Sequence, residues 1–316
     1  MTYLLVSILL SLTLAGLAFA LVAPLAANRG ATAGFLIQCL PAQNVVATGK
    51  ATISFANLLG YTVEYILLEL GGGSLTKAML TDIDIKANAK TIIKDTGANM
   101  DSRMQYRGEG ANAAYLVIAL DESRSRCEIR GRAKDGSLNV IDGEKIGALD
   151  TTFGIQQFTG EITITGATTP SLNAYAELSQ APSADDRFRG LIGKVLNFTV
   201  SPAAAGTFPF DIPYGRQRGA IVKRIFLVGS TVTGHEVKKN GITIMKGVSV
   251  AQVNYTQTRE GRVAQSNIQV IDFIKDGNQS SALNAFDANT MEYYMTVSGA
   301  GNVTVLVELY DLLNNN

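Results

Sequence analysis

The sequence is poor in the residues that most often carry catalytic or redox chemistry. Its 316 residues include one histidine, two cysteines and no tryptophan. The single histidine, His235, excludes metal centres that are built from several histidines. Cys39 and Cys127 are too few for a disulfide framework, so we expect two free thiols, one in a strand and one in a polar loop.

The sequence has no excess of positive or negative charge. Lys and Arg number 27, Asp and Glu also number 27, and the formal net charge is zero. The chain has no long basic run, whereas proteins that grip nucleic acid directly usually carry a basic patch or tail. We therefore expect no direct contact with nucleic acid. Zero net charge also lowers the repulsion between copies, which favours self-association.

Catalytic and phosphate-binding motifs are missing as well. The chain contains neither GxxxxGK[ST] nor HExxH. Asp82 and Asp84 alternate with isoleucines, which predicts a strand with one solvent-exposed and one buried face rather than an acid–base pair. His235 stands beside Glu236, and we expect it to be a surface histidine. The sequence thus predicts no enzyme, no catalytic residue, no cofactor and no metal.

The N-terminal segment is the one long hydrophobic run. Leu4 to Ala27 is free of charged side chains, and the first charged residue is Arg29. A helix of this length reaches about 36 Å, enough to cross a hydrocarbon core of about 30 Å. We predict a membrane-anchoring helix within residues 1–30. The side chains expected to enter the lipid are Leu4, Leu5, Val6, Ile8, Leu9, Leu10, Leu12, Leu14, Leu17, Phe19, Leu21, Val22 and Leu25.

Two other interpretations of this segment fit the sequence less well. A cleaved signal peptide could end at Ala18-Phe19-Ala20, but its first residues would carry Lys or Arg, and these are absent. A buried core helix is less favoured, because the segment is apolar on all of its faces. A retained anchor fits better, and whether it spans the membrane or lies in one leaflet stays open.

The remainder of the chain has the pattern of an all-β protein. Short apolar or alternating runs are separated by Gly, Asn-Gly and Asp-Gly, as in a sandwich or barrel. Tyr61 to Leu70 predicts a long strand that ends at Gly71. Asn240-Gly241 predicts a two-residue hairpin with a type I′ turn, because these residues tolerate successive positive φ angles.

An internal repeat gives the domain organisation. Eight segments of the second half resemble segments of the first in the same order, which indicates a tandem duplication. The pairs are 35–41 with 208–213, 65–68 with 224–227, 85–88 with 237–240, 91–93 with 242–244, 115–121 with 270–276, 148–150 with 282–284, 162–166 with 294–299, and 174–178 with 306–309. Halves of about 130 to 150 residues suit eight-stranded jelly rolls.

The predicted architecture is therefore a double jelly roll behind a membrane helix. Residues 31–181 form the first jelly roll and residues 182–316 the second. In the linker, Ser183 is a plausible N-cap for a short helix over residues 187–195. The first half carries about twenty extra polar residues between Glu122 and Gly147, and a polar, turn-rich insertion belongs on the surface.

A tandem jelly roll with an N-terminal membrane segment resembles the double jelly-roll major capsid proteins. These come from tailless icosahedral viruses with an internal membrane, of the tectivirus, corticovirus and finnlakevirus type. The second half carries the closest likeness. Its segments are Phe210–Pro213, Ile225–Leu227, the hairpin Val237–Ile244, Val270–Phe273 and Val303–Glu308.

The resemblance implies a structural coat protein of a virion. Three chains would form a homotrimer with a pseudo-hexagonal outline, because each chain supplies two similar barrels. These capsomers would tile the shell over the internal viral membrane. The implied partners are other copies of the chain, lipid through residues 1–30, and minor capsid or vertex proteins.

Two rival functions share some of these features. A membrane-anchored bacterial surface or periplasmic protein with two β-sandwich binding modules would have the anchor and the β domains, but would not need halves of equal pattern. A carbohydrate-active enzyme using Asp82, Asp84 or Glu236 would need two carboxylates that face a cleft. The matched halves favour the coat protein.

Overall fold

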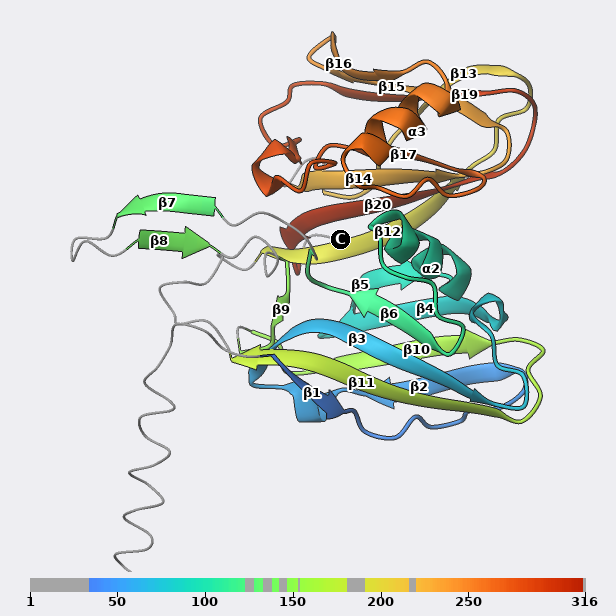
Figure 1. Cartoon of the computed structure of the whole chain (residues 1–316), viewed down its shortest axis with the longest axis vertical. Helices are drawn as coiled ribbons and strands as arrows, with labels where there is room; N and C mark the ends of the chain where they lie inside the picture. Colours follow the sequence, from blue (N-terminus) through green and yellow to red (C-terminus); the bar gives the residue numbers. More distant parts are fainter. Residues whose placement is uncertain are drawn as a thin grey trace, which may run out of the picture. The chain divides into compact units, whose positions relative to one another are not determined.

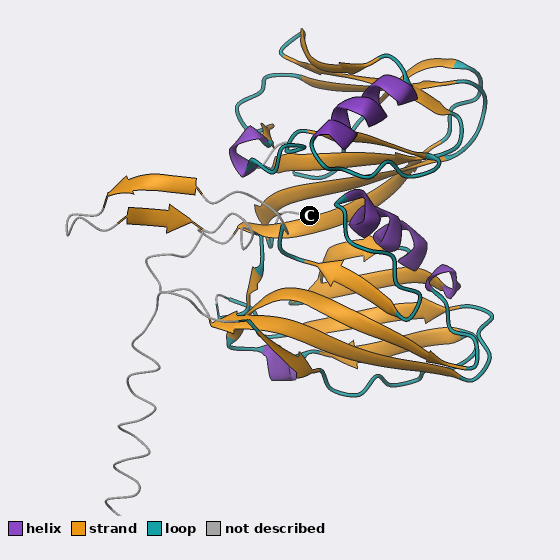
Figure 2. Cartoon of the chain, viewed as in Figure 1, coloured by secondary structure: helices purple, strands orange, loops and turns teal. Residues whose placement is uncertain are grey.

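The computed structural model describes residues 34–122, 128–132, 138–141, 147–152, 154–180, 191–215 and 220–314 (Figure 1). This part of the chain is mostly β-strand, with a few short helices (Figure 2). The predicted membrane anchor and Cys127 lie outside it. Within the described ranges, no helix is both long and apolar enough to cross a membrane.

The first jelly roll consists of two sheets that share one core. One sheet has the strand order β1-β11-β3-β6, with the short β9 beside β3, and the other has the order β2-β10-β4-β5. The bounds are β1 Phe35–Gln38, β2 Gly49–Ser54, β3 Tyr61–Gly72, β4 Leu80–Ala87, β5 Lys90–Asp95, β6 Tyr115–Ala119, β9 Leu149–Asp150, β10 Phe158–Ile164 and β11 Pro170–Gln180.

The second jelly roll repeats this topology strand for strand. Its sheets have the orders β12-β20-β14-β17, with β18 beside β14, and β13-β19-β15-β16. The bounds are β12 Leu191–Val200, β13 Gly206–Phe210, β14 Ile221–Val228, β15 Val232–Lys239, β16 Ile242–Gly247, β17 Ile268–Asp272, β18 Leu283–Asn284, β19 Met291–Val297 and β20 Val303–Leu312.

Seven of the eight predicted segment pairs fall on equivalent strands, which confirms the duplication. The pairing of residues 35–41 with 208–213 is wrong. Residues 35–38 form β1, whose counterpart is β12, whereas residues 208–210 lie in β13, the counterpart of β2. Both runs are short, begin with Phe and end at Pro, so they look alike in the sequence although they occupy different sheets.

Helices occupy the same place in both rolls. α2, Gly97–Tyr106, follows β5, and α3, Val250–Arg259, follows β16. Each begins at a hydroxyl N-cap: Thr96 accepts from the Asn99 amide and Ser249 from the Gln252 amide, both at 3.2 Å. The remaining elements are β7 Glu128–Arg132, β8 Leu138–Ile141, η1 Ala56–Leu58, η2 Lys77–Met79 and η4 Gln279–Ser281.

The structure confirms two of the local predictions and contradicts a third. Asn240 and Gly241 have φ angles of 52° and 77°, which confirms the predicted turn between β15 and β16. Asp82 and Asp84 are partly exposed on β4 and alternate with the buried Ile83 and Ile85, as expected. The helix predicted over 187–195 is wrong where the structure describes it, because residues 191–195 belong to β12, which pairs with β20 along ten residues.

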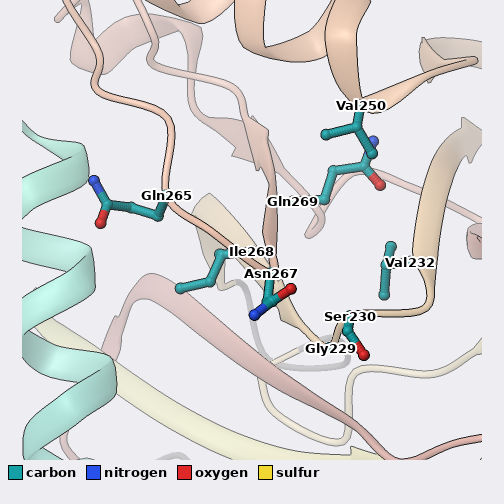
Figure 3. A pocket seen from close by; sticks show the side chains of 8 residues that line it. All are labelled: Gly229, Ser230, Val232, Val250, Gln265, Asn267, Ile268 and Gln269. Carbon is teal, nitrogen blue, oxygen red and sulfur yellow. The ribbon is translucent and has the colours of Figure 1, made fainter.

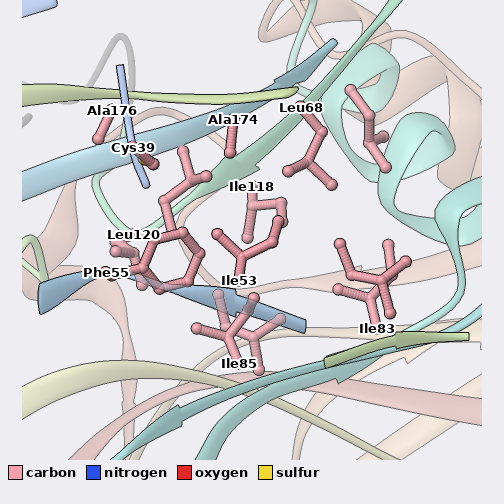
Figure 4. Close-up of a cluster of buried hydrophobic side chains, with 14 of the residues drawn as sticks. Cys39, Ile53, Phe55, Leu68, Ile83, Ile85, Ile118, Leu120, Ala174 and Ala176 are labelled. Carbon is pink, nitrogen blue, oxygen red and sulfur yellow. The ribbon is translucent and has the colours of Figure 1, made fainter. Parts of the chain in front are cut away.

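Each roll has its own apolar core. In the first, side chains from both sheets, such as Leu68 and Ile83, point toward one another (Figure 4). Phe55 packs on Phe158 with ring centroids 4.8 Å apart. Cys39 is a free thiol buried in the same core, and burial raises its pKa to about 12, which leaves it unreactive at neutral pH.

One sheet runs through both rolls. β5 pairs in parallel with β12 at Ile93 and Val195. The sheet β2-β10-β4-β5 of the first roll therefore continues as β12-β20-β14-β17 of the second. Residues 36–316 form one compact unit as a result.

Candidate functional site

The sheet β12-β20-β14-β17 is buried on both faces. In β14, Ile225 and Leu227 face the core of the second roll, while the alternate Phe226 belongs to a separate cluster with Tyr106 of the first roll. The two rings meet edge to face at 5.5 Å. This second face is the junction between the two rolls.

Glu308 of β20 is the centre of a buried ionic network at this junction. Arg103 and Arg107, from α2 and its C-cap, donate to its Oε1 at 2.6 and 2.9 Å. Arg224 of β14 donates to its Oε2 at 2.9 Å. All four side chains are at most 3% exposed. Figure 1 shows α2 lying beside β12 and β20.

Glu122, which follows β6, forms the second node of the network. It accepts from Lys223 Nζ at 2.6 Å and from Arg224 Nη1 at 2.9 Å, and Arg107 Nη2 lies 3.4 Å away. Its side chain is 1% exposed. The prediction that the insertion beginning at Glu122 lies on the surface is thus wrong at this residue, because its carboxylate is needed by three buried cations.

Two further carboxylates complete the network. Asp95, at the end of β5, accepts from Arg103 Nε at 2.9 Å. Asp272, at the end of β17, accepts from Arg224 Nε at 3.2 Å and from the Tyr106 hydroxyl at 2.9 Å. The junction network comprises Asp95, Arg103, Tyr106, Arg107, Glu122, Lys223, Arg224, Asp272 and Glu308.

The network keeps its central acids ionised. Burial alone raises the pKa of Glu122, but Arg107, Arg224 and Lys223 offset this and lower it to about 2. Burial likewise opposes ionisation of Glu308, and the surrounding arginines hold its pKa well below its usual range. A buried charge without its partner costs several kcal/mol, so the network is satisfied only when both rolls are in one relative position.

This arrangement has a structural rather than a chemical use. Within the described part of the chain, no three His, Cys, Asp or Glu side chains cluster in a way that could hold a metal ion. Each junction acid is paired with cations of its own chain, and its side chain is at most 1% exposed. The site fixes two like rolls against each other.

The comparisons with known proteins are consistent with this architecture. The family model of the viral coat protein P2 N-terminal domain matches residues 36–179, and that of its C-terminal domain matches residues 192–313. The chain belongs to the viral coat protein P2 family. A comparison with curated protein sequences gives no match.

Solved structures of capsid proteins share the fold of this coat protein. The major capsid protein P2 from bacteriophage PM2 is 17% identical, with a TM-score of 0.75 over 88% of this chain and 97% of that chain. The STIV major capsid protein is 14% identical, with a TM-score of 0.60 over 89% and 97%. The PBCV-1 virus capsid protein is 11% identical, with a TM-score of 0.56 over 89% and 94%.

The resemblance to double jelly-roll major capsid proteins is therefore confirmed, and the role of the chain is structural. The family is one of coat proteins and not of enzymes. This result favours the coat protein over the anchored bacterial surface protein and the β-sandwich enzyme.

Sequence reasoning missed most of the network of this coat protein. The signal was present: Lys223-Arg224 and Glu308 stand between apolar residues of their strands, where a charge needs a buried partner. It was hidden because the partners Arg103 and Arg107 are far away in the sequence, on a helix that the strand pattern did not predict.

His235 is buried, so the prediction of a surface histidine is wrong. Its side chain, on β15, lies against Gly247 and Val253, and its Nδ1 has no hydrogen-bond partner among the described residues. Burial lowers the pKa of His235 to about 4. The alternation of β15 turns His235 to the same side as the core residue Val237, which the isolated sequence motif did not show.

A small cavity lies apart from the junction network (Figure 3). Its volume is about 150 Å³, and Gln269, whose amide has no partner among the described residues, borders it. Its size and mixed lining suit a few water molecules. The lining residues are Gly229, Ser230, Val232, Val250, Gln265, Asn267, Ile268 and Gln269.

We predict that Glu308→Gln lowers the free energy of unfolding by about 3–5 kcal/mol, because it leaves buried arginines without their charge partner. Glu161→Gln, which weakens the surface ion pairs with Lys50 and Lys86, is the matched control and should cost about 0–1 kcal/mol. Urea unfolding at pH 7 measures both. Equal, small losses would contradict a structural role for the network.

A second prediction concerns pH. The folded-state pKa of His235 lies below the unfolded value of about 6.5, so the unfolded chain binds the proton first as the pH falls. This contribution to stability is present above pH 6.5 and is lost between about pH 6.5 and 4, by about 3 kcal/mol in total. The dependence of unfolding free energy on pH should be flatter in His235→Gln. If His235→Gln leaves the pH dependence of the unfolding free energy unchanged, folding does not lower the pKa of His235.

Proposed function

We propose that this coat protein forms homotrimeric capsomers of pseudo-hexagonal outline that tile an icosahedral shell over an internal membrane. The observation that carries the proposal is the equality of the two rolls together with their fixed junction. Three chains supply six similar rolls, so a threefold particle can occupy a near-sixfold position. A rigid junction suits this arrangement, because the two rolls of each chain must keep the same relative position in all three copies.

The proposal divides the chain into three parts. Residues 1–30 anchor it in the viral membrane, residues 31–181 form the first roll and residues 182–316 the second. The membrane role is supported by the charge-free run from Leu4 to Ala27, which is long enough to insert. The location is the virion, and the further partners are neighbouring capsomers and minor capsid or vertex proteins.

Nucleic acid is not among the proposed partners. The chain has as many acidic as basic residues, and a coat that lies outside a membrane does not touch the genome. The same neutrality lowers the repulsion between the many copies that meet in a shell. Assembly then depends on matched surfaces rather than on charge neutralisation by a polyanion.

The trimer is tested by the mass and outline of the detergent-purified protein. We expect light scattering to give about three times the chain's 33.6 kDa, and negative-stain microscopy to show a near-hexagonal outline. A monomer with two lobes would overturn the proposal. The mass of a stable trimer should stay constant when the protein is diluted a hundredfold, whereas the mass of a transient association should fall.

The anchor is tested by flotation with lipid vesicles. The full chain should float, whereas a chain lacking residues 1–30 should stay at the bottom of the gradient. Leu9→Arg combined with Leu14→Arg is the matched control of equal length, because each central arginine costs about 2.5–3.5 kcal/mol on insertion. Flotation of the truncated chain would refute the anchor role while leaving the trimer intact.

A further inference from the structure

The cavity of the second roll lies where the main chains of the two rolls can be matched residue by residue. In the first roll, the Leu70 amide donates to the Ala114 carbonyl at 2.8 Å, where β3 meets β6. In the second roll, the Gly229 amide donates to the Asn267 carbonyl at 2.9 Å, where β14 meets β17. Gly229 is therefore the counterpart of Leu70, and Asn267 is the counterpart of Ala114.

The first of these positions has lost its side chain in the second roll. Leu70 is 6% exposed and belongs to the apolar core of the first roll. Gly229 has no side chain and borders the cavity. The cavity is thus found where a core leucine of the first roll has no equivalent in the second.

A second difference places a carboxamide beside this space. Leu116 of β6 is paired with Leu68, and at the equivalent position Gln269 of β17 is paired with Leu227. Leu116 and Gln269 are each 1% exposed. One structural position therefore holds an ordinary core leucine in the first roll and a buried glutamine in the second, so the fold itself does not require glutamine there.

The carboxamide of Gln269 is not satisfied within the described part of the chain. Neither its Nε2 nor its Oε1 has a hydrogen-bond partner there. A buried amide without a partner lowers the stability of the fold, whereas leucine at the same position does not. Departures from consistent core packing occur mainly at functional sites. Gln269 is therefore a candidate binding group.

The cavity has a buried floor and an exposed rim. Gln269 lies on the floor with Val232 and Ile268, which are 6% and 8% exposed. Ser230, Val250 and Asn267 on the rim are exposed. Gln265 points away from the other lining side chains (Figure 3) and donates to the Val263 carbonyl. The eight lining residues include no charged side chain, so the site offers no partner for an ion.

A primary carboxamide is the group that best satisfies Gln269. The Gln269 side chain presents an N–H donor and a C=O acceptor side by side. Another primary carboxamide presents the same two groups, so the pair can exchange two hydrogen bonds. A trans peptide group cannot, because its N–H and C=O point in opposite directions.

The rest of the lining limits the size and character of the ligand. Val232 and Ile268 suit a short alkyl stem beside the carboxamide. The cavity volume of about 150 Å³ equals that of about five water molecules at about 30 Å³ each. A ligand with about five non-hydrogen atoms therefore fills it.

We propose that this cavity is a binding site for an uncharged primary carboxamide on a short alkyl stem, and that Gln269 recognises it. The ligand displaces water from the cavity and exchanges two hydrogen bonds with Gln269. This chemistry belongs to small free amides and to the side chains of Asn and Gln on a partner protein. The site is complete in one chain, so the inference does not depend on the proposed trimer.

Propanamide is the first probe, and saturation-transfer NMR on the full chain measures its binding. We expect saturable binding in the millimolar range, as for other ligands of so few atoms. Butanone has nearly the same shape without N–H donors, and should bind at least about tenfold more weakly. Propanoate is charged and should not bind. Absence of propanamide binding would mean that the cavity holds water alone, and equal binding of butanone would also overturn the proposal.

Gln269→Leu tests the recognising group. This variant gives β17 the residue that its counterpart β6 has at Leu116, so it should fold and melt at an equal or higher temperature. It should weaken propanamide binding at least about tenfold. Gln156→Leu, at an exposed position of the first roll, is the matched control and should leave binding unchanged. Unchanged binding in Gln269→Leu would overturn the proposal, and so would a lower melting temperature, because the carboxamide would then serve the fold.

A further probe distinguishes the two sources of the carboxamide. N-acetylglutamine methylamide carries the group on a peptide main chain. Binding at least as tight as that of propanamide indicates the side chain of a partner protein, whereas weaker binding indicates a small free amide. If Gln269→Leu fails to fold, the comparison of propanamide, butanone and propanoate on the unaltered chain still decides whether the site recognises a carboxamide.

Discussion

The buried network around Glu308 is the constraint on which the rest of this coat protein depends. Three arginines reach one carboxylate at 2.6–2.9 Å, two of them from the first roll and one from the second. Removing water from such groups is expensive, and the cost is recovered only when every partner is in place. A hydrophobic junction would tolerate sliding, whereas this one has a single satisfied geometry.

The network works together with a continuous backbone. The parallel contact of β5 with β12 extends one sheet across both rolls, so the main chain and the side chains define the same relation between them. The apolar cluster of Tyr106, Phe226 and Leu306 excludes water from the charges beside it. A capsomer subunit benefits from such rigidity, because small errors in one joint would accumulate around a ring and across a shell.

Duplication explains both the similarity of the rolls and their differences. The two strand orders are identical, yet the equivalent faces hold Arg224 with Glu308 in one roll and Tyr65 with Glu177 in the other. A face that is buried inside the chain can specialise in paired charges, since its partner is always present.

Local sequence patterns were sufficient to predict the β class, the twofold repeat and the turn at Asn240-Gly241, because strand alternation and turn chemistry are local properties. The alternation of residues also predicted that Asp82 and Asp84 lie on the solvent-exposed face of their strand. The sequence did not reveal that Glu122 and His235 are buried, nor that residues 191–195 extend a sheet. Those outcomes depend on which distant segments cover them, and the junction itself joins residues about two hundred positions apart. They become visible in the folded chain alone, because burial of a charge depends on which segments contact it and not on the residue type.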